Sequence, residues 1–280
     1  MRITFCGTAS GVFTGQRASS GLILQHESHM VMLDCGPGSL QGALRAGIKL
    51  HELEAVVLSH LHLDHVLDLA GLPFLNLVGA APVPPVWGPP GTLGAVEATA
   101  AYLSALTAAA AAPIHNAPPP RRFAAPQVTE ISETDEREIC GFVVRSNETP
   151  HAPGVIAAAR RFAADHRVLV FSGDTQPNPG TLVPLSAQAD VLVHECFSLE
   201  GLERAAAARP AANRDQLRRA FTSTHTEVRQ AAAIARDAGV RRLVLTHLLP
   251  EEDPFALQVQ ASAIFAGEIY VGHDGLVLEV

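Results

Sequence analysis

The chain has 280 residues, 48% of them hydrophobic and 17% charged, which excludes an intrinsically disordered protein because there is ample material for a buried core. The formal net charge of −8 argues against a general nucleic-acid binder held by backbone phosphates. Four scattered cysteines without a Cys-x-x-Cys pair predict neither a disulfide framework nor a structural zinc site, and they favour a cytoplasmic location.

Short apolar runs alternate with helical stretches in the first half of the chain. Strands are expected at Ile3–Cys6, Gly21–Gln25, Val31–Asp34 and Ala55–Ser59, a short helix at Leu40–Ala46, a short strand within Pro82–Gly91, a helix at Thr92–Ala112 and a surface loop at Pro118–Pro120. The most apolar stretch, Gly91–Ile114, is mostly alanine and contains Glu97, and the N-terminal sequence reaches Gly7 before a signal peptide could form. We therefore expect no contact with a membrane.

The second half repeats this alternation. Strands are expected at Gly141–Arg145, Gly154–Ala159, Val168–Ser172, Val191–Glu195, Arg242–Thr246, Ile269–Val271 and Leu276–Val280, and a helix at Thr226–Ala238. Leu202–Phe221, interrupted by Pro210, is either a helical hairpin that covers a site or a pair of solvated helices. We expect one domain over residues 1–280, built from two βα halves (roughly 1–140 and 141–280) whose sheets form a sandwich with helices outside.

The strongest functional signal is the segment Ser59–His65, which follows a buried strand and contains His60, His62, Asp64 and His65. Imidazole and carboxylate groups are ligands of first-row metals, and alternate residues of a loop leaving a sheet can converge on one point. No packing requirement explains four such groups beside a hydrophobic strand. This segment therefore predicts a metal site.

Three further ligand-type residues follow apolar strands elsewhere. His151 comes after Gly141–Arg145, Asp174 after the strand ending at Phe171, and His247 after the strand ending at Thr246. Each alone is more often an ordinary cap or turn residue. As a set that joins the Ser59–His65 segment, they predict a larger site at the ends of the strands, where α/β proteins build their sites.

In this order, His60-x-His62-x-Asp64-His65, His151, Asp174 and His247 resemble the metallo-β-lactamase fold superfamily over nearly the whole chain. The resemblance implies an αββα sandwich, an α+β fold of two mixed sheets flanked by helices, with two metal ions per chain. It implies that His60, His62 and His151 hold one metal, that Asp64, His65 and His247 hold the other, and that Asp174 bridges them. Zinc is expected from the nitrogen-rich ligands, with Mn²⁺ or Fe as alternatives.

Other motifs resemble the ribonuclease Z branch, which contains tRNA 3′-end endonucleases, small phosphodiesterases and arylsulfatases. They are Phe5-x-Gly7-Thr8-x-x-Gly11, Leu33–Gly36, Gly71–Pro73, His194–Glu195 and Thr224–Thr226. The resemblance implies that His225 is a histidine outside the metal shell and that Glu195 supports it. Such a histidine can protonate a leaving oxygen. Alternatively, His225 only flanks the following helix and Glu195 is a strand-end surface acid.

Two departures from that branch bear on the substrate. The segment Phe13–Ala18 keeps only Arg17 of the Pro-x-Lys-x-Arg-Asn loop with which tRNA-cleaving members contact RNA. The 23 residues from His151 to Asp174 leave no room for their tRNA-binding arm. An anionic substrate could instead meet arginines in or beside the helical pair, which are otherwise solvated: Arg204, Arg209, Arg214, Arg218 and Arg219.

We therefore expect a dinuclear metal-dependent hydrolase, a phosphodiesterase for a small ester. A hydroxide bridging the metals would be the nucleophile, Asp64 would accept its proton and His225 would protonate the leaving group. The alternatives are a lactonase, thioesterase or arylsulfatase, a tRNA 3′-processing endonuclease, and a non-enzymatic binding protein. The resemblance also favours a homodimer, and tRNA is not expected as a partner.

Overall fold

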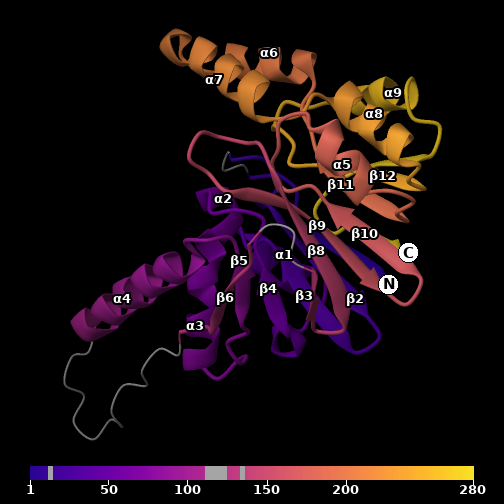
Figure 1. Ribbon diagram of the computed structural model, residues 1–280. Helices are drawn as coiled ribbons and strands as arrows, with labels where there is room; N and C mark the ends of the chain where they lie inside the picture. Colours follow the sequence, from indigo (N-terminus) through magenta and orange to yellow (C-terminus); the bar gives the residue numbers. More distant parts are fainter. Residues whose placement is uncertain (12–14, 111–124, 133–135) are drawn as a thin grey trace, which may run out of the picture.

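The computed structural model describes residues 1–11, 15–110, 125–132 and 136–280, and within them two seven-stranded sheets lie face to face (Figure 1). The first sheet, in spatial order, consists of β14 (Val277–Glu279), β1 (Arg2–Gly7), β2 (Gly21–His26), β3 (His29–Leu33), β4 (Ala55–Val57), β5 (Val86–Gly88) and β6 (Val128–Glu130). Neighbours from β14 to β3 pair antiparallel, and those from β3 to β6 pair in parallel.

The second sheet also combines antiparallel and parallel pairs of neighbouring strands. In spatial order it consists of β13 (Glu268–Val271), β12 (Arg242–Thr246), β11 (Val191–Glu195), β10 (Arg167–Phe171), β9 (Ala157–Ala164), β8 (Phe142–Thr149) and β7 (Glu136–Ile139). Neighbours from β13 to β10 are parallel, and those from β10 to β7 are antiparallel. Parallel strands therefore lie in both sheets, and their carboxyl ends can carry a shared site.

The main core lies between the two sheets. Alternate residues of each strand enter it, such as Leu22 and Leu24 of β2, and Leu169 and Phe171 of β10, all almost completely buried. The residue between, Ile23 in β2, faces the outer helices. Each large apolar side chain buried in this way contributes about 1.5–3 kcal/mol relative to exposure.

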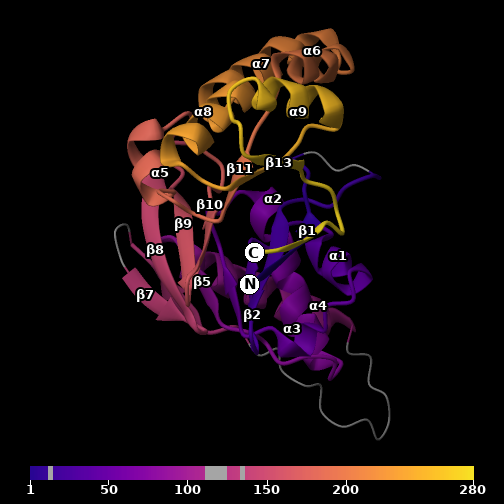
Figure 2. The same ribbon diagram turned by 90° about the vertical axis from the view of Figure 1, so that its right-hand side faces the viewer.

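Helices cover the outer face of each sheet, which gives the predicted αββα sandwich (Figures 1 and 2). Beside the first sheet lie α1 (Ser39–Arg45), α2 (Leu63–Val66), α3 (Gly71–Leu77) and α4 (Thr92–Ala110), with short 3-10 helices at Leu50–Glu52 and Leu67–Ala70. Beside the second lie α5 (Pro179–Leu185), α8 (Val228–Ala238) and α9 (Pro254–Ser262). None of the helices in the described part of the chain has the length and apolar composition needed to cross a membrane.

The segment predicted as a possible hairpin is helical. It forms α6 (Leu199–Ala207) and α7 (Ala211–Thr224), which meet at Pro210 and stand beyond the outer layer of the second sheet (Figure 1). A small separate cluster joins the two helices through Leu202, Leu217 and Phe221.

The structure differs from the predicted elements in several places. The strand expected at Gly154–Ala159 starts at Ala157 and continues to Ala164, because the turn at Gly154 has a left-handed backbone, φ +78°. The predicted halves also exchange strands, since β14 joins the first sheet and β7 joins the second. The end of the helix predicted to Ala112 and the loop predicted at Pro118–Pro120 lie outside the described residues.

Candidate metal centre

The seven predicted ligand residues come together at one end of the sandwich. Four of them lie in the β4–α2 segment: His60, His62, Asp64 and His65. The second sheet supplies the others from the loops after its strands, His151 after β8, Asp174 after β10 and His247 after β12. The strand ends thus bring residues that are up to 183 positions apart into contact.

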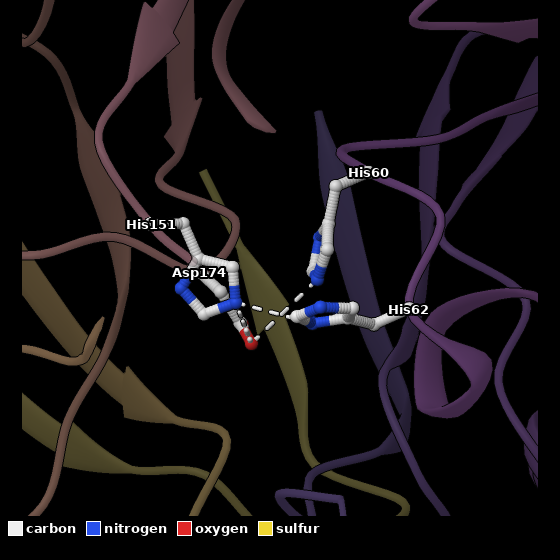
Figure 3. A group of neighbouring side chains, drawn as sticks. All are labelled: His60, His62, His151 and Asp174. Atoms are coloured by element: carbon white, nitrogen blue, oxygen red, sulfur yellow. Dashed lines mark hydrogen bonds and ion pairs between the residues drawn. The ribbon is translucent and has the colours of Figure 1, made fainter. Parts of the chain in front are cut away.

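The first cluster consists of His60, His62, His151 and Asp174, whose side chains point toward one another (Figure 3). His151 Nε2 lies 3.1 Å from His62 Nδ1 and 3.8 Å from Asp174 Oδ2, and His60 Nε2 is also 3.8 Å from Asp174 Oδ2. Burial, and then the neighbouring imidazoles, lower the pKa of all three histidines. They are therefore neutral at pH 7, the form that binds metals.

The second cluster consists of Asp64, His65, Asp174 and His247. His247 Nε2 lies 3.2 Å from Asp64 Oδ2 and 3.3 Å from both His65 Nε2 and Asp174 Oδ2. Ligands bound tetrahedrally at zinc distances of about 2.0–2.1 Å lie about 3.3 Å apart. The four donor groups are therefore spaced to surround one small cation.

The charges at the centre also fit cations. Burial would raise the pKa of Asp174, but His247 and His65 hold it well below its usual range, and the carboxylate stays ionised. His60 Nε2 is buried without a hydrogen-bond partner, while Nδ1 of the same ring contacts Ser59 Oγ at 3.0 Å. An unpartnered nitrogen aimed at buried carboxylates fits a metal ligand. The two clusters share Asp174 and have the composition and spacing of a dinuclear metal site.

Residues behind the clusters fix the orientation of the imidazoles. Asp34 accepts hydrogen bonds from His65 Nδ1 at 2.7 Å and from the Ser59 backbone N–H at 2.7 Å. His151 Nδ1 donates to the carbonyl of Thr224, the last residue of α7, at 2.8 Å. Contacts of this kind fix the tautomer and leave Nε2 available to a metal. Asp34 lies in the motif Leu33–Gly36, but its support of His65 is not evident from the sequence.

Arg160 is a second residue that the sequence analysis misses. This arginine of β9 is 1% exposed and donates to the Leu58 carbonyl from Nε at 3.1 Å and from Nη2 at 2.7 Å, and to Ser146 Oγ. Burial lowers the pKa of Arg160 to about 10, so the guanidinium stays charged. It holds the chain two residues before His60. The sequence feature that could have pointed to Arg160 is its position among the alanines of a core strand.

His225 and Glu195 form the predicted pair beside the clusters. His225 Nδ1 donates to Glu195 Oε1 at 3.1 Å, and its ring stacks between Phe221 and His247, with centroids 4.6 and 5.4 Å away. Burial alone would lower the pKa of His225, but the Glu195 carboxylate outweighs it and raises the pKa to about 9. Glu195 also accepts from the backbone N–H of Thr175, so it is a buried, fixed partner and not the surface acid of the alternative interpretation.

A cavity of about 360 Å³ lies over this centre and contacts ligand-type residues of both clusters. It is also lined by α7, through Leu217, Ala220, Phe221 and Thr224, so one helix of the predicted hairpin borders the site. Of the five candidate arginines only Arg209 lines this cavity. The guanidinium of Arg218 pairs with Glu203 and Asp215, and that of Arg204 donates to the Glu251 carbonyl.

Arg17 lies elsewhere. Its guanidinium donates to Thr8 Oγ1 at 2.8 Å and to the Gly272 carbonyl at 2.7 Å, and it lines a different cavity of about 500 Å³ together with Arg45 and Asp274. The side chain of Arg17 therefore ties the N-terminal loop to the turn before β14 and does not line the cavity over the metal centre. Of the compared segment, Phe13 and Thr14 lie outside the described residues.

Comparison with known proteins supports the resemblance found in the sequence. The family model described as "Beta-lactamase superfamily domain" matches residues 29–248. Ribonuclease Z of Mycobacterium bovis is 32% identical over 285 residues, covering 98% of this chain and 96% of that protein. Ribonuclease Z of Myxococcus xanthus is 30% identical over 323 residues, covering 100% of this chain and 98% of that protein.

Solved structures share the fold. The metallo-beta-lactamase fold protein YhfI of Bacillus subtilis superposes with a TM-score of 0.76 at 22% identity, covering 100% of this chain and 99% of that one. The short form of human tRNase Z superposes with a TM-score of 0.69 at 20% identity, with the same coverage. The chain therefore belongs to the metallo-β-lactamase superfamily of metal-dependent hydrolases, and within it to the ribonuclease Z-like proteins.

Proposed function

We propose that this chain is a metal-dependent phosphodiesterase that cleaves RNA, the activity that the name of its ribonuclease Z relatives denotes. The observation that carries the proposal is one cavity lined by residues of both metal-ligand clusters and by His225, whose ring donates to the buried Glu195. Relatives of that name match this chain over nearly its full length. RNA was the alternative to a small ester in the sequence analysis, and the comparisons support it better.

These relatives weaken the argument that a chain without room for a tRNA-binding arm cannot act on RNA. The alignment with the Mycobacterium bovis protein runs over 285 positions, which leaves no room for a long insertion relative to this chain. The alignment with the Myxococcus xanthus protein runs over 323 positions, 43 more than this chain has residues. Proteins with the same name thus differ in their inserted segments, and the short interval from His151 to Asp174 is compatible with an RNA substrate.

In the proposed mechanism, His60, His62 and His151 would hold one metal and Asp64, His65 and His247 the second, with Asp174 as a ligand available to either cluster. Divalent metals there would acidify a water molecule into a nucleophile at neutral pH and neutralise charge on the phosphoryl group. Zinc suits the nitrogen-rich ligands, with Mn²⁺ or Fe as alternatives. Homodimerisation and a cytoplasmic location stay predictions of the sequence.

The chain's own residues move the protons. Asp64 lines the cavity and accepts the proton of the attacking water. His225 stays protonated at pH 7, because Glu195 raises its pKa, and gives its proton to the leaving oxygen. Arg209, on the cavity wall, binds a phosphate oxygen of the substrate. Leu217 and Phe221 exclude water above the reacting group.

A small phosphodiester is the second candidate. The specific observation is the roof of α7, which limits the cavity to about 360 Å³, the size of a small-molecule site. The net charge of −8 also opposes extended contact with RNA.

The decisive experiment gives metal-loaded protein a precursor tRNA with a 3′ extension and, separately, bis(p-nitrophenyl) phosphate. Cleavage of the precursor at its 3′ end at physiological salt supports the proposal. Hydrolysis of the small diester alone would establish the second candidate instead. Turnover of lactones, thioesters or sulfate esters without phosphodiesterase activity would overturn both, and no hydrolysis at all would favour a binding protein. His62→Ala should abolish metal binding and activity, whereas the matched surface variant His166→Ala should change neither.

A further inference from the structure

A second cavity, of about 380 Å³, lies beside His225. Among the described residues, His225 alone lines both cavities. The second one lies where the ends of α6, α7 and α8 approach α9, with wall residues that include Leu199, Thr222, Glu227 and Gln260. The leaving group, which takes a proton from His225 in the proposed mechanism, therefore lies next to this second cavity.

The walls of this second cavity differ in character. Pro177, Phe197 and Leu199 supply apolar surface, and Leu199 is 56% exposed. Glu200 of α6 and Gln260 of α9 supply polar groups and are joined by a hydrogen bond from Gln260 Nε2 to Glu200 Oε2 at 3.2 Å. The bond leaves Glu200 Oε1 and Gln260 Oε1 free to accept hydrogen bonds from a ligand.

The charges in this cavity balance. Its lining has two carboxylates, Glu200 and Glu227, together with the guanidinium of Arg229 and His225, the proton donor of the proposed mechanism. Carboxylates are the groups that accept hydrogen bonds from ribose hydroxyls in nucleotide-binding proteins. A lining without net charge that combines apolar surface with hydrogen-bond acceptors suits a nucleoside, because its base offers an apolar face and its sugar offers hydroxyl donors.

We propose that this second cavity binds the nucleoside that leaves in the reaction. The inference rests on the proposed phosphodiesterase function. Water adds to phosphorus, the bond from phosphorus to the sugar oxygen breaks with its electron pair on that oxygen, and the oxygen takes a proton from His225. The products are a nucleoside with a free hydroxyl and a nucleotide monophosphate, and the proton lost by the water restores His225.

The test compares two substrates that share the phosphoryl part and differ in the leaving group. One is the dinucleoside monophosphate ApA, and the other is the p-nitrophenyl ester of the AMP isomer that ApA releases. Glu200→Ala and Gln260→Ala should each lower the ratio of kcat/KM for ApA to that for the aryl ester about tenfold, the value of one or two hydrogen bonds. Glu203→Ala is the matched control, because Glu203 is in the same helix but pairs with Arg218 outside the cavity.

Binding of adenosine to metal-loaded protein, measured by calorimetry, gives a readout independent of turnover. Glu200→Ala should weaken it about tenfold, and Glu203→Ala should leave it unchanged. An unchanged substrate ratio in both cavity variants, or hydrolysis of the aryl ester without ApA, would overturn the proposal. If neither substrate is hydrolysed, the phosphodiesterase function fails and adenosine binding alone decides: loss in Glu200→Ala supports a nucleoside cavity, and binding that is absent or unchanged excludes it.

Discussion

His225 is close to the metal clusters without belonging to the seven residues that compose them, so its role can be separated from metal binding. His225→Ala should keep its metal content while kcat falls about 10²–10⁴-fold, because the leaving oxygen loses its proton donor. For esters with good leaving groups, kcat should fall less. Metal analysis and kcat on esters of graded leaving-group pKa would measure this. A variant that loses its metals would make His225 a ligand instead.

Glu195 controls the protonation of His225, which gives a pH-dependent prediction. The carboxylate raises the pKa of the imidazole to about 9 against the effect of burial, and activity should fall as the pH rises through the pKa of this acid. Glu195→Gln removes the charge, so the alkaline limb of the kcat profile should move to lower pH. The profile with Glu203→Gln serves as the control. An unmoved limb would assign proton donation to another group.

The ligand residues could be found from the sequence because each directly follows an apolar strand, and strand ends meet in a sandwich of sheets. Asp34 also follows an apolar strand, β3, but position alone does not tell a metal ligand from a residue that supports one, and Asp34 acts through His65, 31 positions away. Arg160 contacts Leu58 from the opposite sheet, 102 positions away. Contacts between sheets depend on how strands face each other, which hydrophobic spacing does not specify.

At the scale of the strand, Arg160 of β9 holds the end of β4. Arg160→Met keeps the length of the side chain but leaves the Leu58 carbonyl and Ser146 Oγ without their donors, which should cost about 1.5–3 kcal/mol of folding free energy and weaken metal binding. Denaturant unfolding of the metal-free protein and competition with a chelator would measure the two effects.

Arg161→Met is the comparison for that variant. Arg161 neighbours Arg160 in β9 but donates to the Leu185 carbonyl, away from β4. Its replacement should leave metal affinity unchanged. Equal metal affinity in both variants would show that Arg160 supports the fold without positioning His60.

The elements that the sequence does not predict include β6 and β7 at the sheet edges, the helices α3 and α5 of seven residues each, and α9 of nine residues. With three and four residues, β6 and β7 are too short for alternation to be recognised. By contrast, α8 was recognisable: Glu227 and Gln230 form a capping box at its start, and Gly239, with φ +64°, ends it.

At the scale of the whole molecule, the metal centre joins the two halves of the chain. Metals that bind the folded protein and not the unfolded chain should stabilise it, by about 2.7 kcal/mol when free metal is at about 100 times Kd. Chelation should therefore lower the denaturant midpoint, and added zinc should restore it. His62→Ala should be insensitive to the chelator. Equal midpoints with and without chelator would contradict a metal centre between the halves.

Helix α7 contributes to the site in two ways: its side chains line the cavity, and His225 directly follows its last residue. Any displacement of α7 that widens the entrance therefore withdraws the acid from the reacting group and releases the Thr224 carbonyl from His151. Admission of a bulky substrate and proton delivery then occur one after the other. For such a substrate, the return of α7 would be a kinetic step of its own, and turnover would slow as solvent viscosity rises, whereas a small diester would show no such dependence.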